Sequence, residues 1–249
     1  MTTRILLSSL LLLIGVNSFA QTQRSDFSFK EPVDLNALKK ITLWSTQYYI
    51  HQFETSGSIP IILQDDSPST LFADTCDFCK ASLEGTAFIT DSSGQVTVIN
   101  YASTGDSSLV DCRTCKTYSN SKLDVERWGK VRWARSNGFG DGVQNYRLIP
   151  FRTIAVDSKV IAYGTIIFIP DAKGKIIEMP DGEKLLHDGY FFAGDTGSAI
   201  KGNHIDIFTG IHTGNPFPEI IRSSETKTFE AFIVTELSII DALRKIQTK

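Results

Sequence analysis

The chain has 249 residues, of which 25 are basic and 28 acidic, and its formal net charge is −3 at pH 7. The sequence contains no block of basic residues, which argues against nucleic acid as a partner, because phosphate recognition needs clustered lysine and arginine. A chain of this length can form one sizeable domain or two small ones.

The first 20 residues are typical of a secretory signal peptide. Arg4 lies near the start, an apolar run covers residues 5–16, and residues 18–20 fit a small-x-small cleavage site. This run is too short for a membrane span, and no later segment reaches about 18 consecutive apolar residues. We therefore expect an exported, periplasmic or extracellular protein without a transmembrane segment, with outer-membrane association as a further option.

Residues 21–37 are polar and are expected to form a flexible N-terminus. Residues 38–50 combine aromatic and β-branched side chains and predict a strand. Residues 52–60 and 64–70 are polar, contain proline and serine, and indicate linkers or loops.

The four cysteines form two C-x-x-C pairs, Cys76 with Cys79 and Cys112 with Cys115. Thiolates at this spacing can hold zinc, but an oxidising compartment after export favours two disulfides, with all three pairings open. A redox role is a third alternative, although neither pair lies at a strand-to-helix junction of the thioredoxin type. Between the pairs, residues 85–90 and 96–101 predict a hairpin that turns at 91–94.

Short strands dominate the second half of the chain, after a turn-rich segment at 138–142. We expect them at residues 153–156, 161–169, 189–193, 205–208 and 228–235. With little helical pattern between them, they predict an all-β barrel or sandwich. Only residues 237–249 carry apolar side chains at helical spacing and predict an amphipathic helix.

Residues 194–210 place Asp195 and Asp206 among closely spaced glycines. Asp206 lies within a short apolar run that predicts a strand, so we expect its carboxyl to be partly desolvated. Desolvation and a nearby like charge raise a carboxyl pKa, which general-acid catalysis near neutral pH requires. Asp195 could supply that charge or orient Asp206 by a hydrogen bond. The structural alternative is that both aspartates cap backbone amides of turns.

A third aspartate, Asp157, closes the strand R-T-I-A-V-D, and the three aspartates with the D-x-G-x-A-I-K-G block resemble the three-aspartate (3D) domain. This is the barrel domain of membrane-bound lytic transglycosylase A and of smaller secreted wall-active proteins. The resemblance covers roughly residues 138–215 and departs from the family pattern at Ser198, where a second glycine is common. It implies a double-psi β-barrel whose first strand carries a T-x-Y motif, matched by Thr46 and Tyr48.

The resemblance also implies a division of the chain. The barrel would comprise residues 38–54 and 136–236, an inserted cysteine-containing lobe residues 55–135, and a C-terminal helix residues 237–249. The fold class expected is thus a mainly β protein, a double-psi β-barrel with an inserted β-rich lobe. A glycan-binding groove is implied between barrel and lobe.

The activity implied is lytic cleavage of the bond between N-acetylmuramic acid and N-acetylglucosamine in peptidoglycan, with a 1,6-anhydro product. Asp206 matches the catalytic aspartate and would serve as the single general acid and base, with Asp195 supporting it. Two alternatives stay open: a barrel that binds glycan without cutting it, and a hydrolytic glycosidase.

Other residues have expected roles around this pair. Asp157, Lys201, Thr46 and Tyr48 are expected to support the site, although Asp157 is mainly structural and Lys201 fits a solvated turn. Tyr49, Trp44 and His204 are candidates for substrate binding, and Trp128 and Trp133 for stacking on sugars, with core packing as the alternative. The set formed by His187, His204, Asp195 and Asp206 matches no metal-ligand spacing, so we expect no metal, no cofactor and a monomer.

Overall fold

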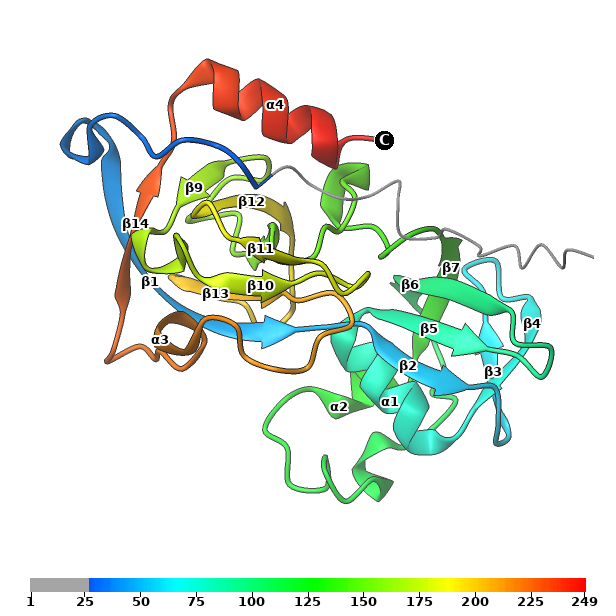
Figure 1. Cartoon of the computed structure of the whole chain (residues 1–249). Coiled ribbons are helices and arrows are strands. Elements are labelled where there is room, and N and C mark those ends of the chain that lie inside the picture. Colours follow the sequence, from blue (N-terminus) through cyan, green and yellow to red (C-terminus); the bar gives the residue numbers. More distant parts are fainter. Residues whose placement is uncertain (1–26) are drawn as a thin grey trace, which may run out of the picture.

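The computed structural model describes residues 27–249, and the expected signal peptide lies outside these residues. The described chain forms a barrel and an inserted lobe that lie side by side (Figure 1). None of the helices in this part of the chain has the length and apolar character needed to span a membrane.

Six strands close the barrel in the order β1-β13-β8-β12-β9-β14. Their bounds are β1 (Lys39–Tyr48), β8 (Thr153–Val156), β9 (Ile166–Phe168), β12 (Tyr190–Asp195), β13 (His204–Phe208) and β14 (Phe229–Ile233). The pairs β1–β13 and β8–β12 are parallel, and the other neighbours are antiparallel. The predicted mainly β fold class, a barrel with an inserted β-rich lobe and a C-terminal helix, is confirmed.

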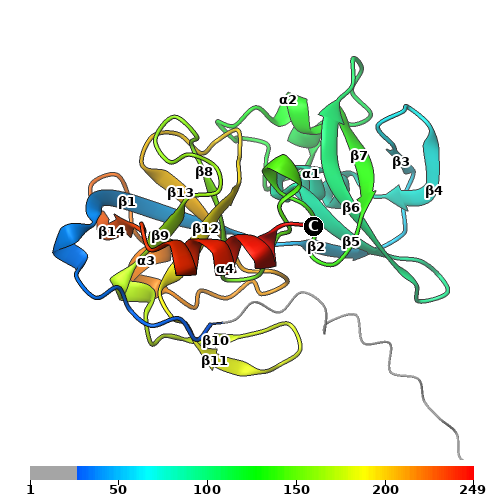
Figure 2. The same ribbon diagram turned by 90° about the horizontal axis from the view of Figure 1, so that it is seen from above.

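Strands β8, β9 and β12 are buried on both faces, which explains their continuous apolar sequences. In β12, Phe191 and Ala193 face the main barrel core, whereas Tyr190 and Phe192 face a second cluster. The C-terminal helix α4 (Leu237–Gln247) covers that second cluster with Ile239 and other apolar side chains, and Figure 2 shows it lying across the barrel. The predicted amphipathic helix is therefore confirmed.

The lobe contains a four-stranded sheet in the order β2-β5-β6-β7 and a two-stranded sheet, β3-β4. The bounds are β2 (His51–Glu54), β3 (Ile59–Ile62), β4 (Pro68–Ala73), β5 (Thr86–Thr90), β6 (Val96–Thr104) and β7 (Val131–Ser136). The predicted hairpin is present as β5 and β6. The prediction of linkers at 52–60 and 64–70 is wrong in part, because β2, β3 and β4 run through them with half-buried, alternating faces.

Two helices of the lobe, α1 (Thr75–Glu84) and α2 (Val125–Trp128), were not predicted. Asp74 caps the start of α1 by accepting hydrogen bonds from the backbone N–H groups of Cys76 and Asp77. Gly85 ends the helix in the left-handed conformation, at φ 82°, a standard glycine termination. These end signals surround a short apolar face, which is why the helical period is weak in the sequence.

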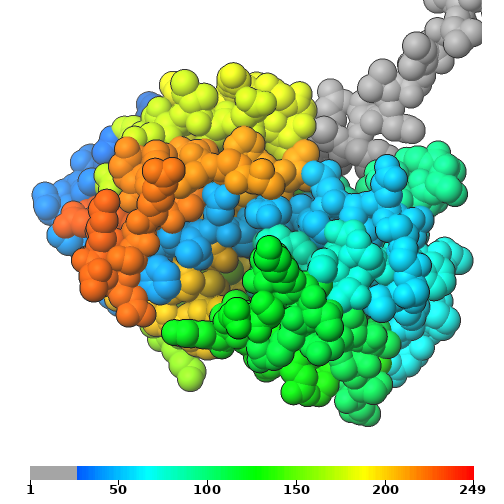
Figure 3. Space-filling model, turned by 90° about the horizontal axis from the view of Figure 1, so that it is seen from below, coloured from blue at the N-terminus to red at the C-terminus, as the bar shows by residue number. Residues whose placement is uncertain are grey.

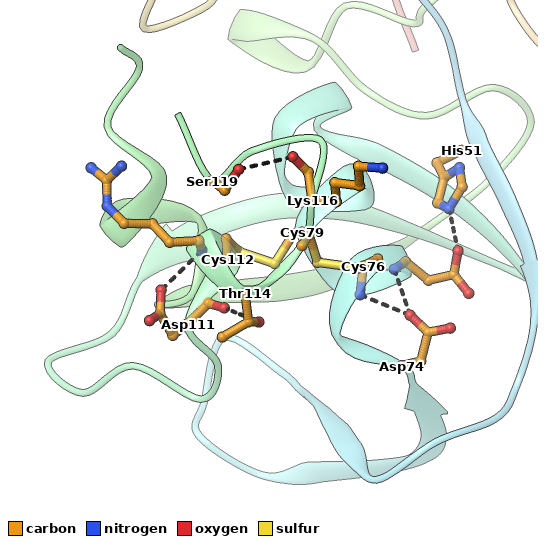
Figure 4. Close-up of a disulfide and its surroundings, with 12 residues drawn as sticks. His51, Asp74, Cys76, Cys79, Asp111, Cys112, Thr114, Lys116 and Ser119 are labelled. Atoms are coloured by element: carbon orange, nitrogen blue, oxygen red, sulfur yellow. Dashed lines mark hydrogen bonds and ion pairs between the residues drawn. A yellow bond between two sulfur atoms is a disulfide. The ribbon is translucent and has the colours of Figure 1, made fainter. Parts of the chain in front are cut away.

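Two disulfides, Cys76–Cys115 and Cys79–Cys112, join α1 to the 3-10 turn η2 (Cys112–Thr114). Figure 4 shows both cysteines of α1 facing this turn. The structure therefore agrees with the disulfide alternative and selects one of the three pairings.

Short elements complete the described chain. They are η1 (Leu35–Ala37), η3 (Val143–Asn145), η4 (Pro170–Ala172), β10 (Ile176–Glu178), β11 (Lys184–Leu186) and α3 (Pro218–Ile221). Strands β10 and β11 form a separate hairpin beside the barrel (Figure 2).

Candidate active site

The site is built on the outer face of two adjacent parallel strands, β1 and β13. Ile205 and Ile207 of β13 fill the barrel core, so strand alternation turns Asp206 outward. The β1–β13 register pairs Trp44 with His204, Thr46 with Asp206, and Tyr48 with Phe208. These pairs form three successive rungs of side chains on the outer face, with the Asp206 carboxyl in the middle rung.

Asp206 is sheltered but not fully enclosed. Its Oδ1 atom is buried and has no hydrogen-bond partner among the described residues. Burial, aided by the negative charges of Glu84 and Asp195, raises the pKa of Asp206 to about 8, while a hydrogen bond with Thr46 opposes the rise. The carboxyl therefore carries a proton at neutral pH and can donate it.

Asp195, at the end of β12, is held by Tyr48. The Tyr48 hydroxyl donates a hydrogen bond of 2.7 Å to Asp195 Oδ2. Burial raises the pKa of Asp195 to about 6, and hydrogen bonds from Tyr48 and the Thr196 backbone limit the rise. The two aspartates thus differ in protonation at neutral pH, with Asp206 mainly neutral and Asp195 mainly ionised.

Trp44 and His204 support the Asp206 rung from one side. Their rings are stacked with centroids 3.6 Å apart and planes inclined by 2°, and His204 Nε2 lies 2.8 Å from Thr46 Oγ1. Burial lowers the pKa of His204, so its ring is neutral near pH 7. His204 is 7% exposed, and one face of Trp44 is covered by it. The contacts of this pair fix Thr46 beside Asp206.

Asp157 and Lys201 lie apart from this group. Asp157 accepts hydrogen bonds from the backbone N–H of Gly202 at 2.9 Å and of Lys159 at 3.0 Å. These bonds lower the pKa of Asp157, and Lys201, which is exposed, adds a weaker attraction. Asp157 therefore ties the loop after β8 to the turn before β13.

The lobe contributes a cluster that the sequence did not predict. Glu84 Oε2 accepts a hydrogen bond of 3.0 Å from the backbone N–H of Tyr49, and Glu84 Oε1 lies 2.6 Å from Lys80 Nζ. The Lys80 ammonium lies 4.8 Å from the centroid of the Tyr49 ring. No sequence signal pointed to Glu84, because its place depends on helix α1 and on how the lobe meets the barrel.

Trp128 and Trp133 belong to the core of the lobe. Trp133 is fully buried against Phe78, and Trp128 is 7% exposed and packs on Tyr118. The alternative of core packing is therefore correct for both, and sugar stacking by them is excluded.

His187 is remote from the site and completes the internal packing of the barrel. It is buried, its Nε2 lies 2.8 Å from the Phe151 carbonyl oxygen, and its ring packs against Phe191. Burial lowers the pKa of His187 to about 3, so the ring is neutral. Across residues 27–249, no group of three or more histidine, cysteine, aspartate or glutamate side chains is placed to hold a metal ion.

Figure 3 shows the molecular surface hollowed where the barrel meets the lobe, beside β1. The Glu84–Tyr49 hydrogen bond joins the two units at the end of β1. The outward rungs of β1 and β13 and the lobe cluster therefore approach each other at this junction.

Comparison with known proteins identifies the central part of the barrel. Residues 152–215 match the model of the 3D domain. No curated protein sequence matches the chain.

Several solved structures have a similar fold. The membrane-bound lytic murein transglycosylase from Agrobacterium tumefaciens has a TM-score of 0.50 and 15% identity over 80% of this chain and 76% of that chain. MltA from E. coli with bound chitohexaose has a TM-score of 0.48 and 16% identity over 77% of this chain and 71% of that one. The lytic transglycosylase LtgG of Burkholderia pseudomallei has a TM-score of 0.37 and 16% identity, covering 78% and 71%. At 15% identity, the likeness to the Agrobacterium structure concerns the fold.

Proposed function

We propose that the protein is a lytic transglycosylase that cleaves the bond between N-acetylmuramic acid and N-acetylglucosamine in peptidoglycan. The observation that carries the proposal is the sheltered Asp206 carboxyl, which lies on the outer face of a barrel containing a 3D domain and whose pKa burial raises to about 8. The fold shared with the Agrobacterium lytic murein transglycosylase supports the choice of substrate. This function places the protein in the periplasm or outside the cell.

In the first step, Asp206 donates its proton to the glycosidic oxygen as the bond from that oxygen to C1 of the muramoyl residue breaks. Positive charge develops on the muramoyl ring, and the newly formed Asp206 carboxylate stabilises it. The ionised Asp195, fixed by Tyr48, adds negative charge near the same place.

In the second step, the muramoyl 6-hydroxyl oxygen bonds to C1 and loses its proton to Asp206. The 1,6-anhydro ring closes and Asp206 regains its original protonation state. One carboxyl serves both steps because the acid and base roles alternate, which removes the need for a second catalytic carboxylate. Thr46 lies opposite Asp206 in the β-sheet register and orients the carboxyl in both steps.

The product distinguishes this function from its alternatives. The protein without residues 1–20 is incubated with purified peptidoglycan, and the soluble fragments are identified by mass spectrometry. Anhydromuropeptides support the proposal. Reducing-end muropeptides indicate a hydrolase, and retention of protein on intact peptidoglycan indicates a binding barrel, so either result contradicts it.

A further inference from the structure

Glu84 brings a carboxylate from the inserted lobe toward Asp206 and Tyr48 of the barrel. It lies in the last turn of α1, and its side chain is only 7% exposed. Its negative charge acts on both Asp206 and Tyr48. The lobe therefore contributes to the electrostatics of the barrel site.

A glutamate at this end of a helix is electrostatically unfavourable, because the last carbonyl groups already present partial negative charge. Two contacts offset the cost. Lys80, one turn earlier in α1, pairs with Oε1, and the Tyr49 backbone N–H donates to Oε2. Tyr49 directly follows Tyr48, so the second contact fixes the chain next to the tyrosine that holds Asp195.

Helix α1 is itself tied down along its length. Both disulfides leave from its first half, and Asp77 lies 2.7 Å from His51 Nε2 in β2 (Figure 4). Glu84 and Asp77 thus bind α1 to both sides of the junction at which the chain passes from barrel to lobe. The position of the Glu84 carboxylate is therefore set by the covalent and polar links of the lobe.

We propose that Glu84 is a positioning residue of the barrel site, through its hydrogen bond to the Tyr49 backbone next to the tyrosine that holds Asp195, and through its buried negative charge at the junction of lobe and barrel. The inserted lobe thereby completes the site instead of only forming a wall of the groove. This inference rests on the proposed function, since it assigns Glu84 a part in the same reaction.

The groups that surround Asp206 come from several elements. They are Thr46 and Tyr48 from β1, Asp195 from β12, His204 from β13 and Glu84 from α1, with Lys80 paired to Glu84. The β8 register partner, Ala155, brings no charge. Glu84 and Asp195 are the two that favour the protonated form of Asp206, and Thr46 opposes them.

The test is a direct titration of the Asp206 carboxyl by carbon-13 NMR in the wild type, E84Q and E126Q. Gln keeps an oxygen that can accept the Tyr49 hydrogen bond but removes the charge, so we expect the pKa of Asp206 to fall by on the order of one unit in E84Q. E126Q is the matched control, because Glu126 also pairs with a lysine one helical turn away in the lobe but is exposed. It should leave the titration of Asp206 unchanged.

Turnover gives a second readout. A general acid works only while it is protonated, so the high-pH limit of peptidoglycan cleavage should move to lower pH in E84Q by the same amount, and not in E126Q. An unchanged Asp206 titration in E84Q overturns the inference. If the wild type cleaves nothing, the proposed function fails, yet the NMR titration still decides whether Glu84 acts on Asp206.

A folding control keeps the test decisive. Should E84Q unfold by near-UV circular dichroism, K80Q/E84Q removes the pair without leaving an unpartnered ammonium. A downward shift in the pKa of Asp206 is again expected, smaller than in E84Q because the positive charge of Lys80 is also removed. E84D retains the charge and should keep the pKa of Asp206 closer to the wild-type value than E84Q does. Equal titrations in E84D and the glutamine variants would contradict the inference.

Discussion

The two aspartates of the site have the same side chain but different surroundings, and these set their protonation. Asp206 has a buried oxygen without a hydrogen-bond partner in the part of the chain that the structure describes, whereas Asp195 accepts a hydrogen bond from Tyr48. Burial raises both pKa values, to about 8 for Asp206 and about 6 for Asp195. One group is thus ready to donate a proton at neutral pH while the other supplies negative charge.

Replacing Asp206 by asparagine should stabilise the fold as the pH rises. The folded carboxyl holds its proton up to about pH 8, but the unfolded one ionises near its ordinary value of 3.8. Between pH 3.8 and about pH 8, ionisation of Asp206 favours the unfolded chain, so the free energy of unfolding of the wild type falls as the pH rises. D206N has no carboxyl at this position and does not show this decline. Relative to its difference from the wild type at pH 3.5, D206N should gain on the order of 5 kcal/mol in free energy of unfolding at pH 8.

Denaturant unfolding of both proteins at the two pH values measures this difference. A gap between D206N and wild type that does not change with pH would show that the carboxyl at position 206 has an ordinary pKa in the folded protein. The proton-donor role of Asp206 would then lose its physical basis.

Replacing Tyr48 by phenylalanine should slow cleavage without preventing glycan binding. The change removes the 2.7 Å hydrogen bond to Asp195, which opposes the rise in the pKa of that carboxyl. Asp195 should then be less ionised at neutral pH, and we expect kcat to fall by roughly 10-fold, with kcat recovering as the pH increases from 6 to 7. Asp195→Asn should likewise lower the rate, by less than Asp206→Asn. A Tyr48→Phe variant with wild-type kcat at pH 6 would refute the supporting role.

Much of the site could be predicted at this scale, because its residues lie on strands with clear signals. The apolar run around Asp206 predicted a partly desolvated carboxylate. The resemblance to the 3D domain implied that Thr46 and Tyr48 lie on the first barrel strand, and the structure pairs that strand with the one that carries Asp206. Glu84 could not be predicted, because its importance depends on a contact between two units distant in the sequence.

At the scale of the element, strand β1 could be predicted from the sequence and helix α1 could not, and the reasons are physical. Strand β1 has an outward row of Trp44, Thr46 and Tyr48, and this two-residue period is easily recognised. Helix α1 has ten residues and a narrow apolar face, and two of its positions are cysteines, of which Cys79 is buried and Cys76 is exposed. A helix this short shows too few repeats of the helical period to be distinguished from the strand patterns around it.

Removing the inner disulfide should destabilise the lobe. Cys79 and Cys112 are buried with Tyr118 and Trp128, and their disulfide closes a loop with a sequence separation of 33 residues. The paired change to alanine should lower the free energy of unfolding by about 2–4 kcal/mol, because the unfolded chain gains freedom when the loop is opened.

Denaturant unfolding of this double variant and the wild type, each without reductant, measures the effect. The matched comparison is the outer pair, Cys76 and Cys115, whose loop has a sequence separation of 39 residues. Because the two loops overlap, removal of either pair alone should cost less than removal of both. Equal stability of the wild type with and without reductant would show that the disulfides contribute nothing to the lobe.

At the scale of the whole molecule, the barrel and the lobe were unequally predictable. The barrel strands β8, β12, β13 and β14 are mostly buried and their apolar runs are visible in the sequence, so their positions could be predicted closely. The lobe is smaller, with half-exposed strands and a core that includes two disulfides. Its local patterns are correspondingly weak.

The candidate site lies where the barrel and the lobe meet, and this explains why the contribution of the lobe to the site could not be predicted from the sequence. Each unit supplies part of the group, the aspartates from the barrel and Glu84 with Lys80 from the lobe. A sequence pattern describes one segment at a time and does not contain the packing of one unit on another.

The central claim is that Asp206 alone transfers the proton in both steps. The most direct measurement compares D206N with the wild type in the rate at which anhydromuropeptides are released from peptidoglycan, with chitooligosaccharide binding measured on the same samples. The account predicts undetectable release by D206N and nearly unchanged binding, because the amide keeps the shape of the side chain but has no acidic proton to donate. Release of anhydromuropeptides by D206N at the wild-type rate would contradict it.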